Sequence, residues 1–327
     1  VGTGSAESSL NIAGAEEALA KARIAAVKDP EFYGLPKPEF GRRILSDYHD
    51  KNLVELSNDE FVKIAWDVLR AGMASFMDVW KVIPSTSRDV APKNPASLKL
   101  VIGGDVQLVR ERVAVASFAM PEPEADESSM TVTSITAMIE SLSAKGSGFF
   151  AGKSLRELAT GGPEACRSAV GSAFATISGE RISSGEYTVV FGPQAVSELI
   201  HNLVTPGLST GSIFAEMSPF AGEFRQQIAA DMLSVYDDGA NPEFMGAKGI
   251  TCEGLPTGRS NLIRGGKLVG LLSSHYDYQR LLYDPEGARK LGADLKEHVH
   301  AFWPRNGFRF STGAGRHFTS DPSTSGS

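Results

Sequence analysis

Hydrophobic residues recur with helical spacing in two segments of the N-terminal half. From about Asn58 to Lys81 the apolar positions follow a period near 3.6, at Phe61, Ile64, Val68, Met73, Phe76 and Trp80. Ser57 and Glu60 stand at the start of this run with the spacing of a capping box. An Ala-rich stretch from about Asn11 to Lys28 has high helix propensity and ends before Asp29-Pro30. The sequence predicts a helix over each range.

The period changes to two between Ser97 and Phe150, which predicts antiparallel strands. Within this region, residues 120–129 hold two prolines and four acidic side chains, a composition typical of a solvated loop. Further on, Pro163 fits the first turn of a helix that runs to about Ser178. One face of this helix is small, so we expect it to pack closely on a neighbouring element. Its residues are Ala165, Ala169, Ala173 and Ile177.

A new unit begins near Gly185. Tyr187 to Phe191 is a short apolar run, which predicts a strand. Gly192-Pro193 then opens a helix to about Leu203, because proline is tolerated in the first helical turn. The sequence thus predicts a strand, a sharp turn and a helix at this point.

The remaining pattern is that of strands and turns. Ala229 to Tyr236 indicates a strand that leads into the acidic turn Asp237-Asp238-Gly239. Arg259–Ile263 and Lys267–Leu272 flank Gly265-Gly266, and a Gly-Gly pair between alternating runs predicts a hairpin.

These elements predict a mixed α+β protein. Helices and an antiparallel sheet occupy the N-terminal half, and a strand-turn-helix opens a β-rich C-terminal domain. We divide the chain into residues 1–10, disordered or appended, a central α+β region of residues 11–182, and a C-terminal domain of residues 183–327.

Composition and charge narrow the classes of function. The chain has 327 residues, and 42% hydrophobic and 22% charged residues are typical of a folded globular protein. Its net charge of −7 argues against binding to nucleic acid or to an anionic membrane. Because the sequence shows no membrane-spanning run and no signal peptide, we expect a cytoplasmic protein. Cys166 and Cys252 are too few for a disulfide framework, and we expect both to be small buried side chains.

One serine lies in the pattern of a hydrolase nucleophile. Gly207-Leu208-Ser209-Thr210-Gly211 matches G-x-S-x-G, in which a strand-to-helix elbow exposes the serine. Here the pentapeptide follows a predicted helix and precedes no clear one. We interpret it as a flexible Gly-rich loop, with a Ser209 nucleophile as the alternative.

His201 is the strongest candidate for a zinc ligand. A zinc peptidase helix carries a second histidine one turn further on, with a glutamate between them that activates water. In this sequence Asn202 cannot act as that base, and Pro206 can neither bind metal nor continue the helix. His298 and His300 diverge on a predicted helix, so we interpret them as surface histidines.

A group of acidic and basic residues in the C-terminal half has the composition of an ion or substrate site. It consists of Asp237, Asp238, Glu253 and Arg259. The alternative is an Asp/Gly turn with surface ion pairs, which would contribute little energy.

The order of these features resembles the TldD/PmbA family of peptidase subunits. The resemblance rests in the C-terminal half on Val235–Gly239, Cys252–Gly254, Arg259–Gly270, Ser311–Gly313 and Gly315-Arg316. In the N-terminal half, Glu16–Ala26 and the proline-rich residues that follow are similar to the family's central helix and connection. The family's leading α/β domain and its final segment have no counterpart, so we expect an architecture shortened at both ends.

The resemblance implies a function in proteolysis. In this family a zinc-bearing TldD-type chain pairs with a PmbA-type (TldE) chain, and the heterodimer encloses a chamber that cleaves small or unfolded peptides. TldD-type chains carry a His-Glu-x-x-x-His helix. His201 falls where its first histidine belongs, whereas Asn202 and Pro206 depart from the motif, as PmbA-type chains do.

We therefore expect a PmbA-like subunit that binds no zinc itself, with zinc only in a TldD-type partner and no catalytic residue of its own. Asp237, Asp238, Glu253 and Arg259 would contact the chamber or the substrate. A homodimer is the alternative to the heterodimer. Two other functions stay open, an autonomous hydrolase with a divergent site and a peptide-binding module without catalysis.

Overall fold

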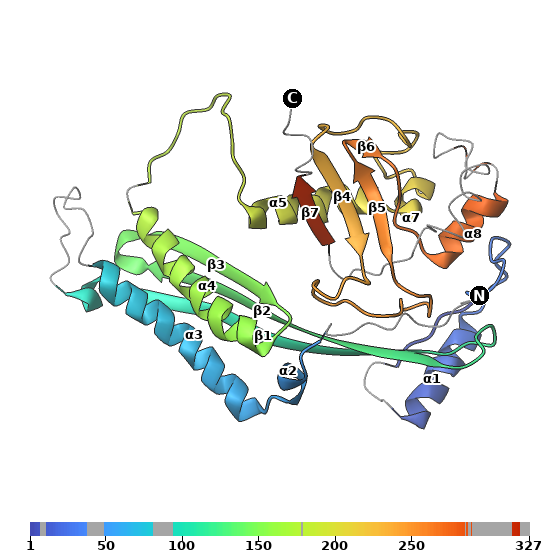
Figure 1. The fold of residues 1–327 in the computed structure, drawn as a ribbon, viewed down its shortest axis with the longest axis horizontal. Coiled ribbons are helices and arrows are strands. Elements are labelled where there is room, and N and C mark those ends of the chain that lie inside the picture. The colour runs from blue at the N-terminus through green and yellow to red at the C-terminus, as the bar shows by residue number, and fades with distance from the viewer. Residues whose placement is uncertain are drawn as a thin grey trace.

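The computed structural model describes residues 1–6, 11–37, 49–80, 94–177 and 179–284, the single positions 286 and 289, and the backbone of residues 316–320. Helices and antiparallel sheets together build this part of the chain, which confirms the predicted α+β class. Figure 1 shows a first sheet covered by α3 and α4, and a second sheet with short helices beside it. None of the helices in the described ranges is long and apolar enough to cross a membrane.

The first sheet contains three antiparallel strands in the order β1-β2-β3. Their bounds are Leu100–Val115, Glu124–Ile139 and Ala144–Gly152. Because β3 pairs only with residues 131–139 of β2, the rest of the long β1–β2 hairpin, residues 109–130, extends as a two-stranded arm. Figure 1 shows this arm running beneath the second sheet.

The arm corrects the prediction of a solvated loop at residues 120–129. The strand β2 already begins at Glu124, and Asp126 and Ser129 are only 6% and 1% exposed. These polar side chains are buried because the arm packs against other parts of the chain, which composition alone could not indicate.

Two capping boxes start the long helices. For α3 (Asn58–Val79), Ser57 Oγ accepts from the Glu60 backbone N–H at 3.3 Å and the Glu60 carboxylate accepts from the Ser57 N–H at 3.1 Å, as predicted. The helix α4 (Leu155–Ala175) begins earlier than predicted, because Ser154 and Glu157 form a second capping box. Pro163 lies inside this helix rather than at its start.

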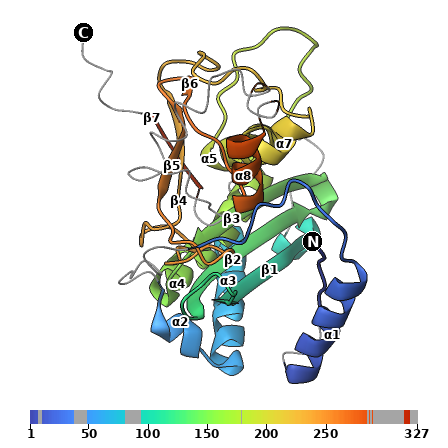
Figure 2. The ribbon, with the colours of Figure 1, turned by 90° about the vertical axis from the view of Figure 1, so that its right-hand side faces the viewer.

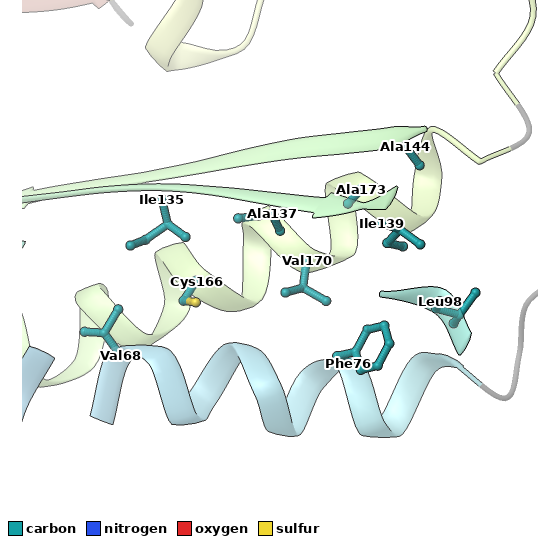
Figure 3. Packing of buried hydrophobic residues seen from close by; sticks show 11 residues of the cluster. Val68, Phe76, Leu98, Ile135, Ala137, Ile139, Ala144, Cys166, Val170 and Ala173 are labelled. Atoms are coloured by element: carbon teal, nitrogen blue, oxygen red, sulfur yellow. The ribbon is translucent and has the colours of Figure 1, made fainter. Parts of the chain in front are cut away.

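The main core of the first unit lies between the sheet and these helices, as Figure 3 shows. Ala165, Ala169 and Ala173 are buried, which confirms the close packing expected of the small face. A Cβ built on Gly148 would lie 1.8 Å from the Ala165 carbonyl oxygen, so α4 crosses β3 at backbone distance.

The second sheet has the strand order β6-β5-β4-β7 in the described residues. The bounds are Leu233–Asp238 for β4, Arg259–Arg264 for β5, Lys267–Leu268 for β6 and Arg316–Ser320 for β7. The predicted hairpin is confirmed: Gly265 and Gly266 connect β5 to β6 with φ of +53° and +73°, which other residues rarely adopt.

The segment that leads into this unit differs from its prediction. Tyr187 to Phe191 is extended but belongs to no strand, and Val190 is 91% exposed. An apolar run becomes a strand only where a neighbouring strand pairs with it, and none of the described strands does so here. The helix α5 (Pro193–Leu199) begins at Pro193, as predicted.

Shorter helices complete the described chain. They are α1 (Ile12–Ile24), α2 (Lys51–Glu55), η2 (Pro95–Leu98), η3 (Glu140–Leu142), α6 (Thr205–Gly207), α7 (Thr210–Phe214) and α8 (His275–Tyr283). Residues 1–6 lie along α1, where Lys21 Nζ donates to the Ser5 carbonyl at 3.1 Å. The predicted domain boundaries stay a prediction, and His298, His300 and residues 311–315 lie outside the described residues.

Candidate functional site

The segment around His201 is helical but bulged. Residues Ile200–Val204 form a π-helical turn, η4, in which the Thr205 N–H donates to the Ile200 carbonyl. Helical structure then continues through Pro206 to Gly207 in α6, so the prediction that Pro206 ends the helix was wrong. The wider π turn accommodates a proline, since its ring would otherwise clash with the carbonyl four residues earlier.

His201 and Asn202 are both exposed on this turn. The Asn202 side-chain amide donates to the Glu198 carbonyl at 2.9 Å. Across the described ranges, no group of three or more His, Cys, Asp or Glu side chains is arranged to hold a metal ion. Among the described residues, His201 therefore belongs to no set of three such side chains.

Asp238 and Arg259 lie together at one end of the second sheet. They face each other across β4 and β5, and the Arg259 guanidinium carbon lies 3.8 Å from the centre of the Tyr236 ring. Asp237 is only 1% exposed and faces Ser260 in the same ladder. Both aspartates belong to β4, so the predicted acidic turn begins later than expected.

Glu253 lies elsewhere, at the start of α8. Both of its carboxylate oxygens accept from the His275 backbone N–H at 3.1 Å, and the positive end of the helix dipole lies at the same place. Burial raises the pKa of the Glu253 carboxyl above its ordinary value and lowers the pKa of the His275 imidazole. The four residues predicted to form one site thus divide into Glu253 at α8 and the other three at the sheet end.

The arm of residues 109–130 contacts the loop of residues 247–257 through residues that the sequence did not single out. The Asp126 carboxylate accepts from the Gly249 N–H at 2.5 Å, and the ammonium of Lys248, which is 8% exposed, pairs with Glu111. No local signal identifies this contact, because its partners are more than 100 residues apart and become neighbours only in the fold.

Apolar packing continues the contact at the tip of the arm. Gly254 has φ of +77°, and a Cβ built there would lie 2.9 Å from the Met120 methyl group and 3.2 Å from a Val115 methyl group. The positive φ favours glycine at this position, whereas the Met120 methyl group is the end of a flexible side chain that could shift to make room.

A segment near the start of the chain also contacts α8, where Figure 2 shows the N-terminal segment passing the helix. The Glu31 carboxylate pairs with Arg280 at 3.0 Å and accepts from the Tyr276 hydroxyl at 3.1 Å. The Tyr33 and Tyr283 rings lie 4.5 Å apart. Segments far apart in the sequence thus converge on α8.

Ser209 does not lie in a nucleophile elbow. It follows the helical turn α6 and precedes α7, and its backbone forms a bridge with Leu272. A nucleophile elbow would require a strand before the serine, and here a helical turn precedes it. The predicted loop is replaced by two short helical turns, with Ser209 between them.

The two cysteines differ. Cys166 is buried in the core, and burial raises the pKa of its thiol, which makes it unreactive. Cys252 is exposed, so the expectation that both would be buried was wrong for this residue.

The fold is shared with three solved structures. One is a proposed modulator of a DNA gyrase from Thermotoga maritima MSB8, with a TM-score of 0.63 and 16% identity over 84% of this chain and 57% of that chain. The second is TldE from Thermococcus kodakarensis, with a TM-score of 0.56 and 20% identity over 82% of this chain and 55% of that chain. The third is a proposed modulator of DNA gyrase from Bacteroides thetaiotaomicron VPI-5482, with a TM-score of 0.61 and 16% identity over 82% of this chain and 57% of that chain. This chain thus spans a little over half of each relative.

By its fold, this is an α+β protein of the type found in TldE. Residues 184–326 match the model of the PmbA/TldA metallopeptidase C-terminal domain, and this part of the chain is a domain of that family. The resemblance to the TldD/PmbA family is thereby confirmed. No curated protein sequence matches the chain.

Proposed function

We propose that the chain is a PmbA/TldE-like subunit without metal, which acts in the cytoplasm and completes the peptide-cleaving chamber of a zinc-bearing TldD-type partner. The match of residues 184–326 to the family domain and the fold shared with TldE support this assignment. Small or unfolded peptides are the substrate class that the family resemblance implies.

The observation that carries the proposal is the chemistry next to His201. Where a zinc peptidase would place a carboxylate base, Asn202 offers an amide that is already bonded to the Glu198 carbonyl. Where the second imidazole would stand, Pro206 has no side-chain donor and lies behind a π turn. Neither residue can activate water or bind zinc.

The test is to purify the chain alone and together with a TldD-type subunit from the same source. We expect a stable complex in which cleavage of a labelled unfolded peptide requires the TldD-type subunit and is lost on chelation of zinc. Zinc in the chain alone should stay far below one per chain and should be the same in His201→Ala. One zinc per chain that disappears in His201→Ala would refute the proposal.

Ser209 provides a second check on the same preparation. If the chain alone cleaves the peptide in the presence of a chelator, and Ser209→Ala abolishes that cleavage, the protein is an autonomous hydrolase. Ser209→Ala should instead leave the activity of the complex unchanged if our proposal is correct.

A peptide-binding module is the second candidate function, favoured by the exposed extended run at residues 187–191. Val189 and Val190 are 61% and 91% exposed, and extended backbone can pair with a peptide strand. Capture of the unfolded peptide by the chain alone, lost in Val190→Asp and kept in the control Ser184→Asp, would support this candidate.

A further inference from the structure

A row of three hydroxyl groups lies in the interior of the first unit. Ser129, Thr131 and Thr133 alternate along β2, so their side chains lie on the same face of the sheet. Ile135 is the next residue on this face, and Figure 3 shows it pointing toward α3 and α4. The three residues are 1%, 0% and 0% exposed, and we call them the hydroxyl row.

None of the three side-chain oxygens has a hydrogen-bond partner among the described residues. A hydroxyl that leaves water without gaining a new hydrogen bond destabilises the folded state, so buried polar atoms in proteins are nearly always bonded. Three such atoms in succession on one strand point to a ligand that bonds to all of them.

Protein surrounds the row, so the ligand must be small. At one end, a Cβ built on Gly162 of α4 would lie 3.5 Å from the Thr133 hydroxyl oxygen. At the other end, the cross-strand neighbour of Ser129 is Arg110, whose guanidinium donates to the Leu53 carbonyl at 3.2 Å and holds α2 against this face. Helices α2 and α4 thus cover the two ends of the row.

Water is the small molecule that fits this chemistry. Each hydroxyl can both donate and accept a hydrogen bond, as a water molecule does, and none carries a charge that calls for an ion. Side chains two residues apart on a strand are about 7 Å apart. Hydroxyls that turn toward each other across that distance leave a gap that one water molecule spans with two hydrogen bonds of about 2.8 Å each. A row of three hydroxyls therefore offers two such positions.

We propose that the hydroxyl row holds two ordered water molecules inside the first unit, one between Ser129 and Thr131 and one between Thr131 and Thr133. Thr131 bonds to both water molecules, so the hydrated row depends on this residue. The site involves none of the residues near His201 and is independent of the proposed peptidase role.

The first test is the stability of Thr131→Val, measured by urea unfolding. Valine has the shape of threonine without its hydroxyl, so both water molecules lose a partner while the packing is kept. We expect the equilibrium constant for unfolding in water to rise about five-fold or more. If the row is dry, the same change removes a hydroxyl that has no partner, and the constant should fall instead. The sign of the effect therefore distinguishes the two cases.

Two further variants serve as controls. Thr136→Val makes the same substitution on the opposite, exposed face of β2, so it corrects for the preference of valine over threonine in a strand. Thr131→Ser keeps the hydroxyl and should keep both water molecules, although it loses a methyl group. Circular dichroism confirms that each variant is folded.

A high-resolution crystal structure of the chain locates the water molecules directly. We expect one water oxygen within hydrogen-bond distance of Ser129 and Thr131 and a second within that distance of Thr131 and Thr133, and neither in Thr131→Val. A wild-type structure with no water at Thr131 would overturn the proposal. The same conclusion follows if Thr131→Val is as stable as Thr136→Val or more stable.

Discussion

The backbone contact between β3 and α4 predicts a large loss of stability in Gly148→Ala. The added Cβ would lie 1.8 Å from the Ala165 carbonyl oxygen, 2.8 Å from its carbonyl carbon and 3.0 Å from the Ala169 amide nitrogen. All three atoms belong to the backbone of α4, so no side chain can rotate to make room. The helix as a whole must move away from the strand.

The required movement sets the expected magnitude. Since Cβ atoms do not approach other heavy atoms closer than about 3 Å, α4 would have to shift outward by about 1 Å. Overpacking of this kind costs about 1–3 kcal/mol and sometimes more. The shift also separates the buried Ala165 and Ala169 from the sheet, so we expect about 3 kcal/mol or more and a Tm lower by roughly 6 °C or more.

The assay is urea unfolding followed by circular dichroism, with two matched controls. Gly103→Ala on β1 and Gly171→Ala on α4 add the same methyl group where nothing lies within 4 Å. We expect the free energy of unfolding to change little or to rise slightly in Gly103→Ala. In Gly171→Ala it should rise by up to about 1 kcal/mol, because alanine favours the helix. If Gly148→Ala unfolds at the same urea concentration as Gly103→Ala, the inferred close contact is wrong.

Three further predictions concern single side chains. Ser154→Ala should cost about 1 kcal/mol by removing the cap of α4, to be measured by thermal unfolding. Asp126→Ala should cost about 1–3 kcal/mol, because the Gly249 N–H loses its acceptor, and Asp126→Asn, which keeps an acceptor, should cost less in the same urea assay. Burial raises the pKa of the Glu253 carboxyl, so the folded state binds this proton more tightly than the unfolded state does. As the pH rises from about 4.5, the wild type should therefore lose stability relative to Glu253→Gln, which does not titrate. A stability difference that stays constant with pH would contradict this prediction.

The elements that could be predicted from the sequence are those stabilised by their own residues. The capping box of Ser57 and Glu60 joins side chains three residues apart, and the Gly265-Gly266 turn requires only its own backbone conformation. Both signals are local, so no knowledge of the rest of the fold is needed to interpret them.

The elements that could not be predicted depend on distant partners. Asp126 belongs to a stretch whose prolines and acids are typical of a loop, yet it is buried because Gly249 donates to it from another unit. The run from Tyr187 to Phe191 has the composition of a strand, yet it stays exposed because no described strand lies beside it. The composition of a segment indicates which structures it can adopt, whereas its pairing and burial depend on the residues that the fold places beside it.

The candidate site shows the same distinction at Pro206. Sequence reasoning treats proline as a helix end because it lacks an N–H and its ring clashes with the carbonyl four residues before it. The π turn, in which Thr205 bonds to Ile200 rather than to His201, widens the helix just ahead of the ring. The helical path therefore includes Pro206 and ends one residue later, at Gly207, although proline cannot bind metal. The sequence thus shows that Pro206 cannot bind metal, but it does not show that the π turn keeps the backbone helical as far as this residue.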